Sequence, residues 1–315
     1  MILKLIHSIV DKLYKLSTKA LLLNNKDKYT KAFILNKLVC LNTKSLDILD
    51  YKIPITFEKN KPMIFNLNGI KIINSNLHRR HLKNFDSTYH NEAKKLLKYF
   101  NHEAEKIIID LGANEGEISI FFAKKIKCKV FAIECAKKNI EILNNNISLN
   151  EVKNIKVLRY AISDKDNIML TVNFKSNQTG VYHQNYVKDA NEKKEIVESI
   201  TLSTLLEKQK INFVDLIKID IENSNYLVAD CILKNSDKIK IIIWELGFQS
   251  AEKYKNVILE LDKKFKFYID VNNNFLELNL NDILKKIEQD VRVDKDGFDL
   301  LLFNKKFDKG HGINI

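Results

Sequence analysis

Strands and helices alternate regularly from about residue 88 to the end of the chain, and this order is the strongest constraint on the fold. Apolar runs at 106–111 and 129–134 are followed by segments of helical periodicity at 117–126 and 137–150. The apolar runs are continuous rather than alternating, which is typical of parallel strands that are buried on both faces. We therefore expect an α/β domain with a doubly wound, mostly parallel sheet.

The rest of the chain continues this order. Further strands are expected at 155–162, 213–220, 238–246, 265–271 and 298–304, and helices at 92–100, 202–209, 225–235, 250–264 and 281–288. Two β-like runs at 167–174 and 195–202 flank a polar loop. The closely spaced strands near the end suit an antiparallel strand inserted at one edge of the sheet. Ligands of such sheets bind beyond the carboxyl ends of the strands, where the strand order reverses.

The N-terminal residues follow a different pattern. Residues 2–23 and 30–49 have helical spacing, and three short apolar runs between residues 53 and 73 read as strands, with a hairpin turn at Asn68-Gly69. We place a domain boundary near residue 85. The expected organisation is an N-terminal basic α+β extension at 1–85 and an α/β domain at 86–315.

Positive charge is concentrated in this extension. Residues 1–85 hold 16 lysines and arginines against 5 acids, whereas residues 86–315 hold 36 against 35. Such a segment suits an anionic membrane surface or a charged acceptor, although 48 lysines, 4 arginines and 36 asparagines also fit a drift in composition. Proteins that read nucleic acid bases favour arginine, so nucleic acid is disfavoured as a partner. Peripheral membrane contact through residues 1–50 is one expectation.

Cysteine usage and the first residues indicate a compartment. None of the four cysteines forms a CxxC pair or has histidines at metal-binding spacing, which indicates reduced thiols. Residues 1–16 carry charge every few positions and lack the small-residue cleavage site of a secretory signal. The sequence therefore predicts a cytoplasmic protein, with any membrane contact at the inner face. It does not indicate an oligomeric state.

The segment DLGANEG at 110–116 follows one strand and begins a helix. Gly112 and Gly116 let the backbone pass close to a ligand. The helix start after Gly116 offers free N–H groups and partial positive charge, which suit a carboxylate or a phosphate. The spacing differs from the GxGxxG of dinucleotide-binding folds, and this argues against a nicotinamide cofactor.

Polar side chains stand at the ends of the next two strands. Glu134 ends the strand after the loop, where a carboxylate can accept both hydroxyl protons of a ribose. Ser163 and Asp164 follow the run at 155–162, where an acid or hydroxyl can meet an adenine amino group. Together with the glycines, these residues predict a site for one nucleoside at the mouth of the sheet.

Three acids follow later strands. Asp220 and Glu222 follow the strand at 213–220, and Glu245 stands near the end of the strand at 238–246. These acids could hold a hard divalent cation through oxygen, or one could act as general base toward a hydroxyl; Asp220 could instead cap the next helix. His183 is a further candidate base, although an isolated loop histidine is usually only exposed.

The blocks IIIDLGANEGEISIFFAKK, AISD, SITLSTLLEKQ, FVDLIKIDIEN and IIIWELG, with Glu134, resemble the FkbM family of S-adenosylmethionine-dependent methyltransferases. The resemblance runs from about Glu92 to Asn304, and the order and spacing of the blocks are more specific than any single motif. It implies a Rossmann-like class I methyltransferase fold, whose seven-stranded sheet ends in an antiparallel strand at 298–304. It also implies O-methylation of a sugar, a glycan or a related metabolite.

The resemblance also implies roles for individual residues. The methionine part of the cofactor would be surrounded by Asp110, Gly112, Asn114 and Gly116. Glu134 would hold the ribose, and Ser163 with Asp164 would flank the adenine.

Asp220 and Glu222 stand in the family's I-D-x-E-G block, where this chain departs from the pattern. Asn223 replaces the usual glycine, and Asn225 replaces an acid. This puts in doubt a metal site that needs the extra acid, and a divalent cation stays open as a second cofactor.

The expected mechanism follows from the cofactor, whose sulfonium methyl is already electrophilic, so that the enzyme mainly aligns an acceptor oxygen with it. A sugar hydroxyl needs a base or a cation to weaken its O–H bond. Asp220 is the first candidate, with Glu222, Glu245 and His183 in support. Two alternatives stay open. The first is a catalytically degenerate module that binds the cofactor or that binds a partner through its basic N-terminal segment. The second is an RNA methyltransferase, which the nearly neutral residues 86–315 disfavour.

Overall fold

A computed structural model of the chain describes residues 55–56, 64–67, 70–73, 89–100, 104–174, 181–182, 193–247, 251–271, 274–291 and 297–307. The helices expected at 2–23 and 30–49, and His183, lie outside these residues. The chain divides into two units, Met1–Tyr89 and His90–Ile315. Each unit is described by itself.

The described part of the first unit is an antiparallel sheet of three strands. They are β1 (Ile55–Thr56), β2 (Ile64–Leu67) and β3 (Ile70–Ile73), in the order β1-β2-β3. Leu67 is paired with Ile70, so two residues separate the paired ends of β2 and β3. β2 and β3 are therefore the antiparallel strands expected on either side of Asn68-Gly69, which lies outside the described residues.

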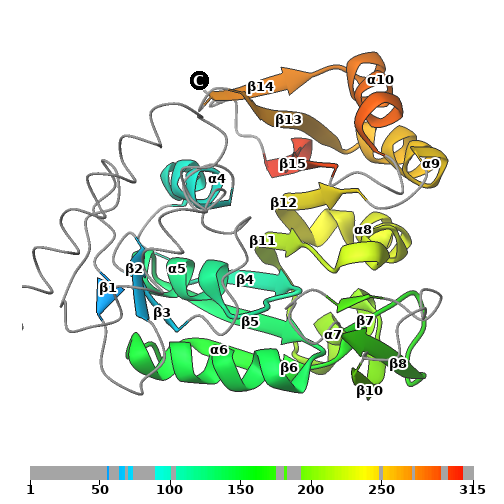
Figure 1. Cartoon of the computed structure of the whole chain (residues 1–315). Coiled ribbons are helices and arrows are strands. Elements are labelled where there is room, and N and C mark those ends of the chain that lie inside the picture. The colour runs from blue at the N-terminus through cyan, green and yellow to red at the C-terminus, as the bar shows by residue number, and fades with distance from the viewer. Residues whose placement is uncertain are drawn as a thin grey trace, which may run out of the picture. The chain divides into compact units, whose positions relative to one another are not determined.

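An eight-stranded sheet with the order β14-β13-β15-β12-β11-β4-β5-β6 forms the centre of the second unit (Figure 1). Its strands are β4 (Lys106–Leu111), β5 (Cys128–Glu134), β6 (Ile155–Arg159), β11 (Val214–Ile219), β12 (Ile239–Leu246), β13 (Phe265–Val271), β14 (Asn274–Leu278) and β15 (Phe298–Asn304). The five strands from β6 to β12 pair in parallel, whereas β15 is antiparallel to both β12 and β13. The doubly wound sheet and its antiparallel strand at 298–304 are thereby confirmed.

The expected count of seven strands omitted β14. This strand pairs antiparallel with β13 at the edge of the sheet, and Val271 is paired with Asn274. Its signal is weak because it is short and half exposed: Phe275 is buried, but Leu276 is 51% exposed. An edge strand needs only one apolar face, so it lacks the continuous apolar run that marks the central strands.

Helices cover both faces of the sheet. They are α4 (Tyr89–Leu96), α5 (Glu117–Lys125), α6 (Lys137–Leu149), α7 (Leu202–Lys208), α8 (Ala229–Asn235), α9 (Ala251–Asp262) and α10 (Leu280–Asp290), with 3-10 turns η1 (Leu97–Tyr99), η2 (Glu222–Val228), η3 (Ser236–Lys238) and η4 (Lys305–Phe307). The helix expected at 225–235 is thus the end of η2 followed by α8. Among the described residues, no helix is both long enough and apolar enough to cross a membrane.

Alternation along the strands separates two layers of core. Ile109 of β4 and Ile217 of β11 belong to a buried cluster with Leu205 of α7, Ile232 of α8 and Ile258 of α9. On the other face, Ala132 of β5 packs with Leu143 of α6, and the ring of Phe122 of α5 lies edge-on to Phe100. Neighbouring residues of a buried strand point to opposite faces, which is why these strands are apolar throughout.

A second, smaller sheet has the order β7-β10-β8-β9. Its strands are β7 (Ala161–Ile162), β8 (Met169–Phe174), β9 (Val181–Tyr182) and β10 (Lys193–Ile200). The two β-like runs expected around a polar loop are therefore strands, and they pair antiparallel as β8 and β10.

The expectation of a single strand at 155–162 is wrong. The run breaks at Tyr160: β6 stays in the main sheet, whereas β7 pairs in parallel with β10. Arg159, the last residue of β6, pairs with Glu195 of β10 at 2.9 Å. Ala161 packs with Val172 and Val197 of the small sheet, so the apolar end of the run has its own core there.

Candidate active site

The loop between β4 and α5 has a left-handed backbone that glycine favours. Gly112 has a φ of 82° and Gly116 a φ of 92°, and Asn114 between them has a φ of 49°. A Cβ atom on Gly112 would lie 1.8 Å from the backbone oxygen of Asp220, and one on Gly116 would lie 2.2 Å from a methyl carbon of Leu143. Gly112 is therefore required by the close approach of the backbone as well as by φ, whereas Gly116 is required mainly by φ, because the Leu143 side chain can move.

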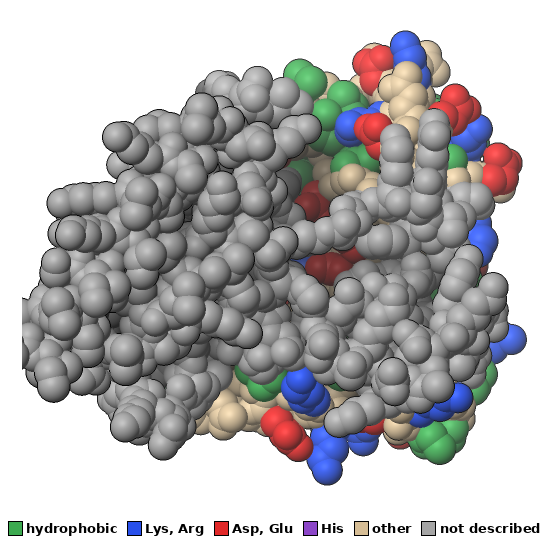
Figure 2. Space-filling model, viewed as in Figure 1, with side chains coloured by type: hydrophobic (Ala, Val, Ile, Leu, Met, Phe, Trp, Pro, Cys, Tyr) green, Lys and Arg blue, Asp and Glu red, His purple; other side chains and the backbone are tan. Residues whose placement is uncertain are grey.

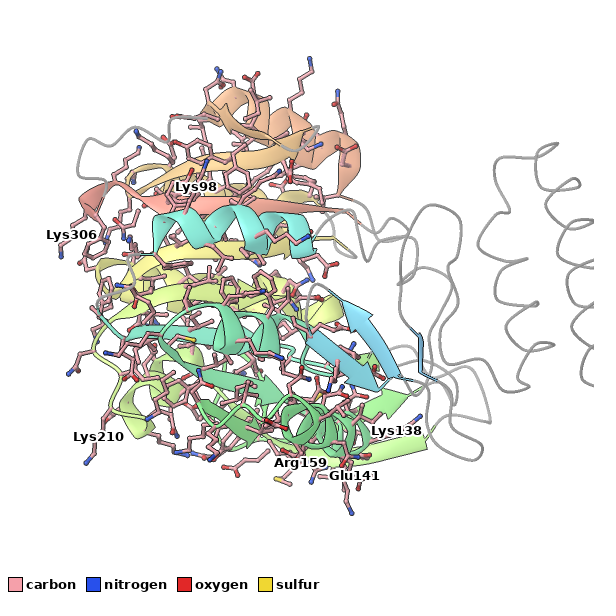
Figure 3. All side chains as sticks on the ribbon, turned by 90° about the vertical axis from the view of Figure 1, so that its left-hand side faces the viewer. Lys98, Lys138, Glu141, Arg159, Lys210 and Lys306 are labelled. Carbon is pink, nitrogen blue, oxygen red and sulfur yellow. The ribbon has the colours of Figure 1, made fainter. Side chains whose placement is uncertain are left out.

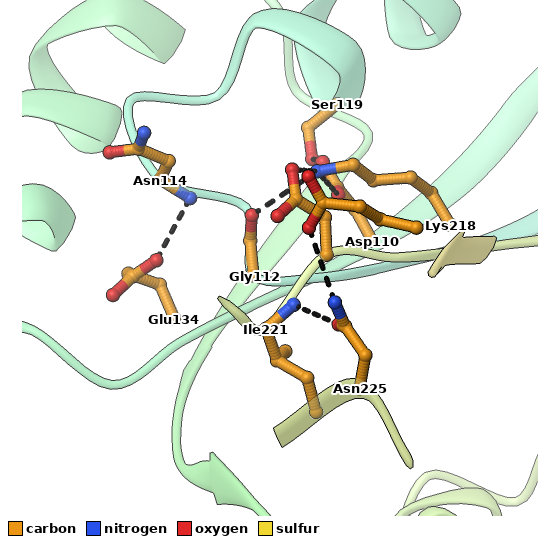
Figure 4. A network of polar contacts seen from close by, with 10 residues as sticks. Asp110, Gly112, Asn114, Ser119, Glu134, Lys218, Ile221 and Asn225 are labelled. Carbon is orange, nitrogen blue, oxygen red and sulfur yellow. Dashed lines mark hydrogen bonds and ion pairs between the residues drawn. The ribbon is translucent and has the colours of Figure 1, made fainter. Parts of the chain in front are cut away.

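Glu134 lies directly against this loop. Its carboxylate accepts a hydrogen bond from the backbone N–H of Asn114 at 2.9 Å (Figure 4). It also accepts one from the backbone N–H of Ala136 at 2.8 Å. The Glu134 side chain is buried, and burial raises the pKa of its carboxyl, although these backbone hydrogen bonds oppose the rise. The structure thus brings together the glycine loop and the acid at the end of β5.

A buried lysine joins the ends of β4 and β11. Lys218 Nζ lies 3.0 Å from Asp220 Oδ2 and 3.7 Å from Asp110 Oδ1, and it donates a hydrogen bond to the Gly112 carbonyl at 3.4 Å. Burial alone would lower the pKa of Lys218, but Asp220 and Asp110 outweigh it and raise the pKa above its usual value. Lys218 is therefore a permanent cation among these acids.

Sequence reasoning missed Lys218 because it stands inside the apolar run of β11. The signal was its position: it lies two residues before Asp220, and residues i and i+2 of a strand point to the same face. A lysine on the buried face of a central strand needs an anionic partner, and two acids of the expected site were available.

Glu117 is the second residue that sequence reasoning missed. It is the first residue of α5, directly after Gly116, and its side chain is partly buried. Burial raises the pKa of the Glu117 carboxyl to about 7; Lys218 opposes this rise, and Asp110 and Asp220 add to it. A carboxyl with a pKa near neutral therefore lies at the same carboxyl ends of the strands as Asp110 and Asp220.

Asn225 organises the segment after β11. Its side-chain oxygen accepts the backbone N–H of Ile221 at 2.7 Å, and its Nδ2 donates to Glu245 Oε2 at 3.2 Å. Its backbone carbonyl accepts the indole N–H of Trp244 at 3.2 Å. Asn225 is fully buried, so it ties the end of β11 to the end of β12.

Ser163 and Asp164 occupy a different place from the one expected. They follow β7 of the small sheet, not a strand of the main sheet, because of the break at Tyr160. Ser163 donates its backbone N–H to Ile200 at 3.1 Å and its hydroxyl to Asp164 at 3.1 Å. Asp164 is exposed, whereas Ser163 is buried.

Comparison with known proteins identifies the family to which this chain belongs. The model of the methyltransferase FkbM domain matches residues 110–275, which is just over half of the chain. The chain belongs to the FkbM methyltransferase family. This confirms the resemblance found in the sequence, and with it S-adenosylmethionine as the cofactor.

Individual relatives of this FkbM protein match over shorter stretches. An uncharacterized RNA methyltransferase of Caldanaerobacter subterraneus is 27% identical over 44% of the chain and 27% of its own length. The release factor glutamine methyltransferase of Buchnera aphidicola is 30% identical over 21% of the chain and 24% of its own length. The chain thus spans about a quarter of the length of these relatives. A crystal structure of an rRNA methylase from Streptococcus thermophilus is 11% identical with a TM-score of 0.40, covering 68% of this chain and 95% of that one.

The acids expected as cation ligands in this FkbM domain have other partners. Asp220 is paired with Lys218, and Glu245 accepts the Asn225 amide; the Glu222 side chain lies outside the described part of the chain. Within the described residues, no group of three or more histidine, cysteine or acidic side chains could hold a metal ion. The amide of Asn225, at the position where the family usually has an acid, serves as a structural bridge.

We expect Asn225→Asp to destabilise the chain by about 2–4 kcal/mol at pH 7, because a buried carboxylate would then face Glu245 in place of the amide donor. Repulsion raises the pKa of such a pair in the folded state above its unfolded value, so the loss is largest at neutral pH and shrinks toward about pH 4. Urea denaturation at pH 7 and at about pH 4 measures this loss of stability. Asn145→Asp, at an exposed position of α6, is the control, and equal stability of the two variants would contradict the bridging role.

Proposed function

We propose that the chain transfers the methyl group of S-adenosylmethionine to a hydroxyl of a sugar, a glycan or a related metabolite. The observation that carries this proposal is the Glu134 carboxylate, which is hydrogen bonded to Asn114 N–H at 2.9 Å against the Gly112 loop. A carboxylate fixed at this point suits the two hydroxyls of a ribose. Asp110, Gly112, Asn114 and Gly116 would hold the methionine part, and Ser163 with Asp164 would flank the adenine.

The residues around Lys218 support a hydroxyl acceptor. The cofactor supplies an electrophilic methyl group, so the chain has to orient the acceptor and take up its proton. Asp220 is the proposed base, and Lys218 fixes its carboxylate at 3.0 Å. In the space-filling view, acidic side chains are visible near the middle of the face (Figure 2). Glu245 is held by Asn225 at 3.2 Å, and Glu222 and His183 stay candidates on sequence grounds.

Transfer of labelled methyl groups tests this function. Purified full-length protein is incubated with methyl-labelled S-adenosylmethionine and either extracted cell-surface glycans or total RNA. We expect label in the glycan fraction, and its loss in Asp220→Asn even at a cofactor concentration that saturates binding. Label in RNA alone would instead favour the kind of substrate named for the Caldanaerobacter relative, and the nearly neutral residues 86–315 argue against that result.

A second candidate function is a catalytically degenerate module that binds the cofactor or a partner. The observation in its favour is Asn225, an amide with a structural role at a position where the family usually has an acid. Cofactor binding without methyl transfer to any glycan, metabolite or RNA fraction would support it. We also propose a cytoplasmic location, with the basic residues 1–50 in contact with the anionic inner membrane face. Sedimentation with anionic lipid vesicles tests this contact.

A further inference from the structure

We propose that Glu117 is a further cofactor-binding residue, which forms an anionic ring with Asp110 and Asp220 and favours the positively charged methyl donor over its product. The inference rests on the proposed function, because it requires that S-adenosylmethionine binds at the Gly112 loop. It concerns the charge of the ligand, and the acceptor does not enter into it.

The ring is built from three elements that meet at the carboxyl ends of β4 and β11. Asp110 comes from the end of β4, Glu117 from the first turn of α5, and Asp220 from the residue after β11. Lys218 stands among them, 3.0 Å from Asp220 and 3.7 Å from Asp110. The Glu117 carboxyl interacts electrostatically with Lys218, Asp110 and Asp220. When ionised, the three carboxyl groups carry three negative charges, against the one positive charge of Lys218.

One carboxylate oxygen of Asp110 lacks a hydrogen-bond donor among the described residues. Asp110 is 1% exposed, and its Oδ2 accepts the Ser119 hydroxyl at 2.6 Å. Its Oδ1 has no hydrogen-bond donor among the described residues, and Lys218 is too far away at 3.7 Å to serve as one. A buried carboxylate oxygen without a donor is costly, and a cationic ligand with N–H groups would satisfy it.

The pKa of Glu117 is raised mainly by burial, which makes its ionisation sensitive to a bound cation. Its pKa is raised to about 7 by burial, with Asp110 and Asp220 adding to the rise against Lys218. A ligand that brings positive charge makes the ionised form of Glu117 favourable. S-adenosylmethionine carries an ammonium and a sulfonium, whereas its demethylated product keeps the ammonium but has a neutral sulfur. The ring therefore distinguishes donor from product by one charge.

Calorimetric titration with both ligands tests the proposal. In Glu117→Gln, we expect the affinity for S-adenosylmethionine to fall about tenfold at pH 8 and that for S-adenosylhomocysteine to fall less than about threefold. Glu117→Asp keeps the charge and is expected to restore most of the preference for the donor. Glu141→Gln, which removes the same charge from an exposed position of α6 (Figure 3), is the control and is expected to change neither affinity.

The pH dependence gives a readout that loss of structure would not produce. Protonation of Glu117 removes its charge, so affinity of the wild type for the donor is expected to rise as the pH passes through about 7. The rise should be smaller for the product and absent for both ligands in Glu117→Gln. An equal loss for both ligands, an unchanged donor affinity, or a pH dependence that persists in Glu117→Gln would overturn the proposal. If the wild type binds neither ligand, the proposed function itself fails.

Discussion

Gly112→Ala abolishes binding of S-adenosylmethionine and destabilises the chain by roughly 2–5 kcal/mol, the sum expected from left-handed backbone strain and overpacking. The added Cβ would lie 1.8 Å from the backbone oxygen of Asp220. The loop and the end of β11 would have to separate, and this would draw the Asn114 N–H away from Glu134. Urea denaturation and calorimetric titration with the cofactor measure the two effects.

Gly297→Ala is the matched control for Gly112→Ala. Gly297 has a φ of 74°, and its Cβ would lie 1.8 Å from the backbone oxygen of Leu246, outside the Gly112 loop. The two variants should therefore lose similar stability, but only Gly112→Ala should lose cofactor binding in its folded fraction. Normal affinity in Gly112→Ala would show that the loop does not contact the cofactor.

Glu134→Gln lowers the affinity for S-adenosylmethionine about 100-fold, because it removes the charge from two hydrogen bonds to the ribose hydroxyls, each contributing about 1.5 kcal/mol or more. The change also affects the apo protein. Both carboxylate oxygens accept backbone N–H groups, from Asn114 and Ala136, so the NH2 of glutamine would face one of these donors. A modest loss of stability is therefore expected beside the larger loss of affinity.

Titration with adenosine as well as S-adenosylmethionine tests whether the loss of affinity in Glu134→Gln arises at the ribose. Both ligands contain the ribose, so both should bind more weakly in the variant by a similar factor. Glu141→Gln serves again as control, since Glu141 projects from the surface of α6 (Figure 3). An affinity of Glu134→Gln within about threefold of the wild type would refute the assignment of Glu134 to the ribose.

The main sheet was predictable because its strands are buried on both faces. Continuous apolar runs in β4, β5, β11 and β12 leave little choice but a parallel sheet between two layers of helices. The loop was predictable as well, since two glycines between a strand and a helix are rarely accidental at that position. The edges of the sheet were harder, because β14 and the break at Tyr160 depend on pairing with distant strands.

The polar interior of the site was only partly predictable. Glu134 could be found because it stands at the end of a strand. The roles of Lys218, Glu117 and Asn225 were missed. Part of their role depends on contacts with residues far away in the sequence, such as Lys218 with Gly112, 106 positions away. The position of Lys218 two residues before Asp220 was a signal that the sequence did offer. Asn225 looked like a loss of an acid in the sequence, whereas the structure shows an amide that bridges two strand ends. Partners, rather than residue types, decide the role of such side chains.

The break at Tyr160 has a consequence for how force passes through the molecule. Strands β6 and β7 are joined by this single residue, although they belong to different sheets. Arg159 reinforces the junction: it pairs with Glu195 of β10 and also donates a hydrogen bond to the carbonyl of Cys135, the neighbour of Glu134. A ligand that pushes on the small sheet would therefore strain the carboxylate that faces the glycine loop, through a covalent tether and one guanidinium.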